Sequence, residues 1–246
     1  MSGHSKWNNI KRKKEKTDAQ KAKVFTKIGR EIAVAVREGG ADASSNARLR
    51  DLIAKAKSLN VPNDNINRVI KRAEGGEKDN YEAITYEGYG PGGIAVMVET
   101  LTDNRNRTAA NMRHYFDKYG ASMGQSGSVA FQFVQKGLVL LDGAGADEEK
   151  LMEDVFDAGA EDFDVGGDDV CVAECEPLKA GEVAEALREK GYQVISAEAE
   201  FVATTTVSLS SPEDLKRMGQ LLDHLEEDDD VQSVWHTLEN EEDLDR

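Results

Sequence analysis

The first third of the chain has apolar residues at helical spacing, interrupted by glycine and proline positions that end helices. The pattern predicts a helix over Asp18–Glu38. Its core stripe consists of Phe25, Ile28, Ile32 and Val36. Two shorter amphipathic helices are expected near Ala47–Leu59 and Pro62–Ala73. Residues 1–76 therefore predict a small helical bundle preceded by a polar arm.

Beyond Glu77 the period changes, and strands alternate with helices. Strands are expected at Tyr81–Tyr86, Ile94–Leu101 and Ser128–Val134, with a helix at Asn106–Tyr119 before the third strand. In that third strand Val129, Phe131 and Phe133 share one face, which is typical of core packing.

The next segment, residues 137–203, has the complete order β-α-β-β-α-β. Its predicted elements are strand Leu138–Leu141, helix Asp147–Ala158, strands Asp162–Val165 and Asp169–Glu174, helix Leu178–Lys190 and strand Gln193–Val202. After it we expect strand Thr205–Leu209, helix Ser211–Leu225 and strand Val231–Leu238.

The order of these elements predicts an α+β protein. After the helical bundle, one ferredoxin-like split βαβ domain is inserted into another. The three expected domains are residues 1–76, residues 77–136 joined by 204–246, and the inserted residues 137–203.

Charge divides the chain in a way that hydropathy does not. The formal net charge is −16, yet residues 1–76 carry 18 Lys and Arg against 8 Asp and Glu, whereas residues 77–246 carry 13 against 39. Clustered cations gain binding free energy from a polyanion by releasing its counterions. Nucleic acid, as double-stranded DNA or as ribosomal RNA and tRNA, is therefore the expected partner. No apolar run approaches the roughly 18 residues of a membrane span, so no membrane contact is expected and the cytoplasm is the predicted location.

The basic arm and the polar face of the first helix supply the candidate contacts. From the arm these are Lys6, Trp7, Asn8, Asn9, Lys11, Arg12, Lys13, Lys14 and Lys16, and from the helix Lys23, Lys27, Arg30 and Arg37. Taken alone, a basic helix face is more often simply solvated. Trp7 has two interpretations, stacking on a base or ribose and packing the arm against the bundle, and packing is slightly favoured.

Two further arginines lie where a strand passes into a helix. Arg105 and Arg107 could hold a phosphate beside the helix N-terminus. Equally, Asp103 or Asn104 could cap the helix while both arginines pair with nearby carboxylates.

No pattern of catalytic residues is visible. The four histidines are dispersed, and no nucleophile with a spaced base occurs, so no catalytic residue and no cofactor are expected. Cys171 and Cys175 have no neighbouring histidine to complete a zinc site and are expected to be reduced structural thiols. The acidic run Glu226–Asp230 lacks calcium-loop spacing, so it predicts a solvated helix end and no metal site.

Four segments resemble the signature segments of the YebC/PmpR family. They are GHSKW at residues 3–7, YEGYGPGG at 86–93, TDNRNRT at 102–108 and GSVAF at 127–131. The resemblance covers essentially the whole chain. It implies a three-domain cytoplasmic protein without known catalytic activity, of a family described as DNA-binding transcriptional regulators. Other members are described as ribosome-associated translation factors that relieve stalling on proline-rich stretches. In that second case the acidic domains are expected to face ribosomal or other basic proteins.

Overall fold

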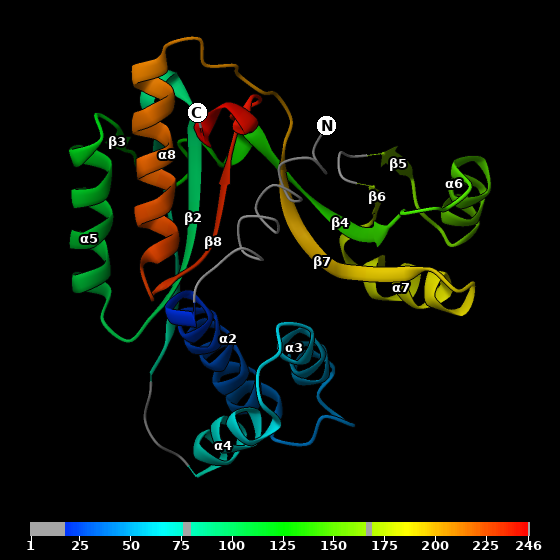
Figure 1. The fold of residues 1–246 in the computed structure, drawn as a ribbon. Coiled ribbons are helices and arrows are strands. Elements are labelled where there is room, and N and C mark those ends of the chain that lie inside the picture. The colour runs from blue at the N-terminus through cyan, green and yellow to red at the C-terminus, as the bar shows by residue number, and fades with distance from the viewer. Residues whose placement is uncertain (1–17, 76–79, 166–168, 246) are drawn as a thin grey trace. The chain divides into compact units, whose positions relative to one another are not determined.

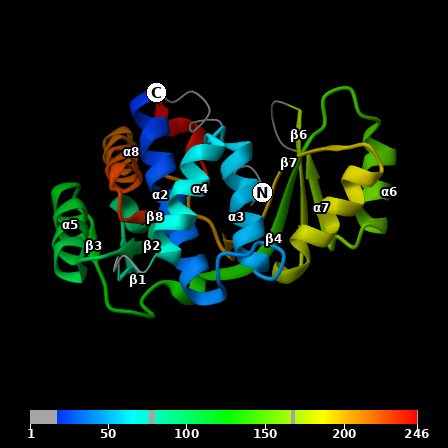
Figure 2. The ribbon, with the colours of Figure 1, turned by 90° about the horizontal axis from the view of Figure 1, so that it is seen from below.

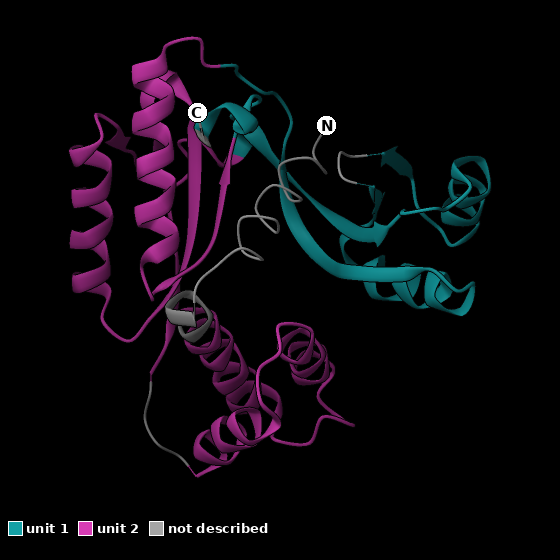
Figure 3. Ribbon diagram, in the orientation of Figure 1, with its two compact units in different colours: residues 1–15, 131–208, 237–246 teal, residues 16–130, 209–236 magenta. Residues whose placement is uncertain are grey.

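The computed structural model describes residues 18–75, 80–165 and 169–245. They form two compact units, coloured separately in Figure 3. The bundle-and-sheet unit lies within Lys16–Ala130 and Leu209–His236, and the split βαβ unit lies within Phe131–Ser208 and Thr237–Arg246. Helices followed by two antiparallel sheets confirm the α+β fold class. The three domain boundaries inferred from the sequence stay a prediction.

Three helices form a bundle in the bundle-and-sheet unit (Figure 1). They are α2 (Asp18–Gly39), α3 (Ala47–Ser58) and α4 (Asn63–Glu74). The predicted apolar stripes pack together, and the buried cluster contains Ile28, Ile32, Val36, Leu49, Leu52, Ala56 and Ile66. Isolated helices of 12 residues are marginal in water, so burial of this cluster provides most of their stability.

Asn46 connects α2 to α3. Its Oδ1 accepts a hydrogen bond from the backbone N–H of Leu49 at 3.0 Å, and its Nδ2 donates to the carbonyls of Ala35 and Gly40 at 2.8 Å each. One buried amide therefore satisfies backbone groups at the end of one helix and at the start of the next.

The sheet of the same unit is entirely antiparallel, in the order β3-β1-β2-β8. Its strands are β1 (Glu82–Tyr89), β2 (Ala95–Thr102), β3 (Ser122–Met123) and β8 (Val231–His236). Helices α5 (Arg105–Lys118) and α8 (Pro212–Glu227) lie side by side against it (Figures 1 and 2).

A glycine-rich turn joins β1 to β2. Gly92 has a φ of 67°, in the left-handed region that favours glycine, and the N–H of Gly90 donates to the carbonyl of Ile94 at 2.7 Å. The segment therefore makes a tight structural turn.

The strand predicted at Ser128–Val134 is wrong over residues 128–132 and is confirmed only at Phe133 and Val134. Residues 130–132 form a short 3₁₀ turn, and the next strand begins at Phe133. The reason is the buried carboxylate of Glu87, which accepts hydrogen bonds from the N–H groups of Gly127, Val129 and Ala130 at 2.7–2.8 Å. Those N–H groups cannot also join a sheet ladder.

The predicted core face of that segment is also partly wrong. Val129 and Phe133 are buried, but Phe131 is 74% exposed. Strict alternation of side chains holds only in an extended strand, and the 3₁₀ turn breaks it at Phe131.

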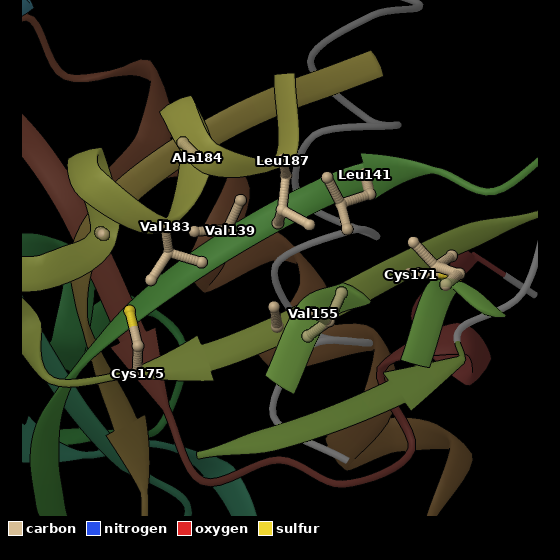
Figure 4. Close-up of a cluster of buried hydrophobic side chains, with 11 residues drawn as sticks. Val139, Leu141, Val155, Cys171, Cys175, Val183, Ala184 and Leu187 are labelled. Carbon is tan, nitrogen blue, oxygen red and sulfur yellow. The ribbon is translucent and has the colours of Figure 1, made fainter. Parts of the chain in front are cut away.

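The split βαβ unit has the predicted element order, with an antiparallel sheet in the spatial order β5-β6-β4-β7. Its elements are β4 (Phe133–Asp142), α6 (Glu148–Asp157), β5 (Asp162–Val165), β6 (Val170–Cys175), α7 (Ala180–Glu189) and β7 (Gln193–Ala203). Figure 4 shows its core, where strand residues such as Val139 and Leu141 meet Val155, Val183 and Leu187 from the helices.

Cys171 and Cys175 lie in this core as free thiols, as the sequence predicted. Burial raises the pKa of both thiols, because the apolar surroundings disfavour the thiolate.

The strand predicted at Thr205–Leu209 is reduced to a single bridge between Val207 and Leu238. Residues 205–208 are exposed, with Val207 at 41%, and in this segment only Leu209 is buried, so little apolar surface is available to hold a longer strand.

Candidate nucleic-acid interface

Nine of the predicted contact residues lie outside the described residues. They are Lys6, Trp7, Asn8, Asn9, Lys11, Arg12, Lys13, Lys14 and Lys16. The structure describes the other six predicted contacts, which are Lys23, Lys27, Arg30, Arg37, Arg105 and Arg107.

The basic stripe of α2 points at the end of α8. Lys23 Nζ donates to the carbonyl of Glu227 at 2.9 Å, and Lys27 Nζ donates to the carbonyl of Glu226 at 2.6 Å. The last carbonyls of a helix have no partner within the helix and lie at the negative end of its dipole. Both lysines therefore satisfy the end of α8 in this structure.

Arg30 continues the stripe into the loop after α8. Its NH1 atom donates to the carbonyl of Asp229 and to Oδ1 of Asp230, both at 2.7 Å, and its guanidinium lies 5.5 Å from the ring centre of Tyr81. About two turns further along α2, Arg37 NH2 donates to the carbonyl of Tyr81 at 3.3 Å.

Asp230 is the buried centre of this contact, with 2% of its surface exposed. Besides Arg30, its carboxylate accepts hydrogen bonds from Arg107 NH2 at 2.7 and 2.9 Å and from Thr108 Oγ1 at 2.7 Å. Burial disfavours the charged form, but the hydrogen bonds from Arg107, Thr108 and Arg30 outweigh it and hold the pKa of Asp230 below its ordinary value. The sequence predicted that the acidic run Glu226–Asp230 is a solvated helix end. That prediction is wrong for Asp230, which is buried and paired.

Asp228 organises the same loop from the other side. Its carboxylate accepts hydrogen bonds from Asn111 Nδ2 at 3.1 Å, from Tyr115 Oη at 3.0 Å and from the N–H of Asp230 at 2.8 Å. Burial and the Asp228 charge raise the pKa of Tyr115 to about 12.

Arg105 and Arg107 adopt the locally paired arrangement. The side chain of Asn104 caps α5 by accepting from the N–H of Arg107 at 3.1 Å. The Arg107 guanidinium pairs with Asp103 at 2.8 Å as well as with Asp230, and Arg105 pairs with Glu82 at 3.0 Å. Whether either arginine also contacts a phosphate stays a prediction.

A polar pocket of about 380 Å³ lies where α2, the start of α5 and the end of α8 meet. Three cations line it, Lys23, Arg30 and Arg107, together with five carboxylates from Asp103 and the run Glu227–Asp230. The excess of carboxylates makes this pocket a poor site for a phosphate. Within the described ranges, no group of three or more His, Cys, Asp or Glu side chains is arranged to hold a metal ion.

Sequence reasoning missed two features of this region. The burial of Asp230 had no local signal, because its partners come from distant parts of the chain. The exposed cations Lys57, Arg68 and Lys71 did have a local signal in the sequence. On α4, Arg68 and Lys71 lie on the helix face opposite the apolar stripe that contains Ile66.

None of the described helices is long and apolar enough to span a bilayer. Two family models together match most of the chain: the TACO1/YebC protein N-terminal domain at residues 5–76, and the TACO1/YebC second and third domain at residues 81–238.

Similar proteins match over nearly their full length. One from Ruminiclostridium cellulolyticum, named "Probable transcriptional regulatory protein", is 54% identical over 246 residues, with 98% of each chain covered. A protein of the same name from Finegoldia magna is 50% identical over 242 residues, covering 98% of this chain and 100% of the relative. The crystal structure of a conserved hypothetical protein from Aquifex aeolicus has a similar fold, with a TM-score of 0.83, 41% identity and coverage of 91% of this chain and 92% of that one.

Proposed function

Because the chain belongs to the TACO1/YebC family, we propose that it is a nucleic-acid-binding regulator of gene expression without catalytic activity. The names of its relatives, which describe transcriptional regulators, support the regulatory part of this proposal. The binding part rests on charge.

The uneven charge is the observation that carries the proposal. Residues 1–76 have 18 basic and 8 acidic side chains in a protein whose net charge is −16. Solubility alone gives no reason to collect cations at one end of an acidic chain, whereas phosphate binding does. In this proposal Lys11, Arg12, Lys13 and Lys14 of the arm contact phosphates.

The cations of α2 differ from those of the arm because the structure already gives them partners within the protein. Lys23, Lys27 and Arg30 already donate to carbonyls of the same protein. To contact a phosphate they must exchange those partners, so their substitution is expected to change stability together with affinity.

Salt dependence tests the proposal. If about six phosphates are neutralised, affinity for nucleic acid should fall roughly a thousandfold between 50 and 200 mM salt. Fluorescence anisotropy with labelled duplexes measures this fall. Deletion of residues 1–16 should weaken binding and flatten the salt slope. Binding that ignores salt, or that survives the deletion unchanged, contradicts the assignment.

The charge of the remaining chain favours one alternative, ribosome-associated translation regulation. Residues 77–246 carry 39 acidic against 13 basic side chains, which duplex DNA repels. On a ribosome the same surface can face basic proteins while the arm binds RNA. Sedimentation of a cytoplasmic lysate through a sucrose gradient separates the two: co-migration with ribosomes supports the alternative, and a protein that stays at the top opposes it.

A further inference from the structure

Among the bundle side chains that the structure describes, three cations differ from the rest in having no partner. Among the side chains described in residues 23–75, Lys57, Arg68 and Lys71 make no ion pair and no side-chain hydrogen bond. By contrast, other cations on the same helices are paired: Arg48 lies 2.6 Å from Glu38, and Lys55 lies 3.9 Å from Glu31.

Arg68 and Lys71 are held outward by the packing of α4. They are three residues apart and therefore neighbours on one face of the helix, with exposed Asn67 beside them. The opposite face carries Ile66 into the bundle core. The two cations cannot turn inward without withdrawing that apolar stripe, so this face stays toward solvent.

The pair of helices α3 and α4 is also arranged in a way that suits contact with a nucleic-acid duplex. Both helices are 12 residues long, the connection is Leu59–Pro62, and Asn60 adopts a φ of 59° to make the sharp change in direction. Figures 1 and 2 show the two helices as neighbours at the end of the bundle. Two helices joined by about four residues resemble the arrangement in which helix-turn-helix proteins place a second helix against a duplex.

We propose that the outward face of α4, extended by Lys57 at the end of α3, binds the phosphate backbone of a nucleic-acid duplex. This inference rests on the proposed function and assigns it a surface. Arg68 and Lys71 contact phosphates, and the amide of Asn67 reaches a base edge or a sugar. Asp64 lies on the same face one turn before Arg68, so the three cations leave the face positive but not uniformly so.

The size of the effect follows from counterion release. Each phosphate contact contributes about −0.9 to the slope of log K against log salt for duplex DNA. The double change Arg68→Gln and Lys71→Gln should therefore flatten the slope by about 1.8 and weaken binding on the order of 10- to 100-fold at 0.1 M salt.

The chain offers a matched control. Arg48→Gln with Lys55→Gln removes the same charge from the same bundle, but from side chains that pair with Glu38 and Glu31 on α2. The experiment uses the full chain, with fluorescein-labelled duplex DNA and duplex RNA of matching sequence, and anisotropy at several salt concentrations. Thermal melting followed by circular dichroism checks that each variant is folded. The charge-conserving pair Arg68→Lys and Lys71→Arg should keep the wild-type slope.

The outcomes separate the two proposals. A flattened salt slope for the α4 variant, together with a near wild-type slope for the control, supports binding at the α4 surface. The duplex for which the two variants differ shows whether this surface binds DNA or RNA. Equal weakening by both variants overturns the inference, because it indicates diffuse attraction to the whole bundle. If the α4 variant binds as tightly as the wild-type protein and with the same salt slope, the inference about α4 is overturned, but the proposed function is not. Failure of the wild-type protein to bind either duplex overturns the proposed function as well.

Discussion

At the scale of single residues, Asp230 joins parts of the bundle-and-sheet unit that are far apart in the chain. Arg30 comes 200 residues earlier and Arg107 comes 123 residues earlier, yet both donate to the same carboxylate. Thr108 adds a third donor. A buried carboxylate with this many charge-assisted bonds orients its partners and becomes costly to neutralise.

The change Asp230→Asn should destabilise the protein by about 1.5 to 3 kcal/mol. The amide keeps the shape, but its NH2 group faces arginine donors and the charge of Arg30 loses its partner. Urea unfolding measures the loss. The exposed neighbour provides the control: Asp229→Asn makes the same charge change and should shift stability by less than about 0.5 kcal/mol. Equal effects of the two changes contradict a special role for Asp230.

Acid should weaken the fold through two buried carboxyls. Burial opposes the charge of Asp230 and of Glu87, but their hydrogen bonds prevail and both pKa values lie below the ordinary range. A carboxyl with a lowered folded pKa stabilises the protein above its unfolded pKa of about 4, and the contribution disappears as the pH falls through the folded pKa. Unfolding free energies measured between pH 6 and pH 3 should decrease, and the decrease should be shallower for Asp230→Asn. An equally steep decrease in that variant argues against the linkage.

At the scale of elements, caps and helix ends decide how the bundle is held together. The cations of α2 satisfy the last carbonyls of α8, and Asn46 satisfies the junction of α2 with α3. In both places polar side chains satisfy backbone groups that a helix leaves without partners. The same principle prevents a strand at Gly127–Ala130, where the carboxylate of Glu87 takes the N–H groups that a sheet would need.

Asn46→Ala should cost about 2 kcal/mol, because it removes the N-cap of α3 and leaves the carbonyls of Ala35 and Gly40 without the amide donor. Helical circular dichroism followed against urea reports the loss. Ser45→Ala is the neighbouring control: Ser45 is exposed and bonds only the nearby carbonyl of Asp42, so its removal should be almost neutral. A neutral Asn46→Ala variant is incompatible with this account of the junction.

At the scale of the whole molecule, the first and last strands of the split βαβ unit bring the two ends of segment 133–203 next to each other. Phe133 of β4 pairs with Ala203 of β7, and just outside them the N–H of Thr204 donates to the carbonyl of Gln132 at 2.8 Å. Neighbouring ends are what an inserted module requires. The structure therefore supplies exact cutting points for testing the predicted insertion.

Replacement of residues 133–203 by a short Gly/Ser linker should leave the rest of the chain folded. The linker has only to join Gln132 to Thr204, and the bundle core and the β1-β2-β8 core keep their own residues. A single cooperative urea transition and retained helical signal are expected. The isolated segment 133–203 provides the complementary sample and should also unfold cooperatively. Loss of a cooperative transition in the shortened chain counts against the insertion.

The sequence by itself determined the features that depend on near neighbours. Ile28 and Ile32 recur at helical spacing, so α2 and its buried face followed from the pattern alone. The β-α-β-β-α-β order of the split βαβ unit followed in the same way, since each element is signalled within its own residues. The four family segments were also readable without a structure.

Only the tertiary structure decided which polar groups meet. Lys23 and Arg30 lie on a helix face that, from the sequence, is equally suited to solvent, phosphate or protein, and their partners lie about 200 residues later in the chain. The same holds for Asp230, which stands in an acidic run with no local mark of burial. Helical and strand periods arise from contacts a few residues apart, whereas the partner of a charge is set by where the folded chain brings distant segments together.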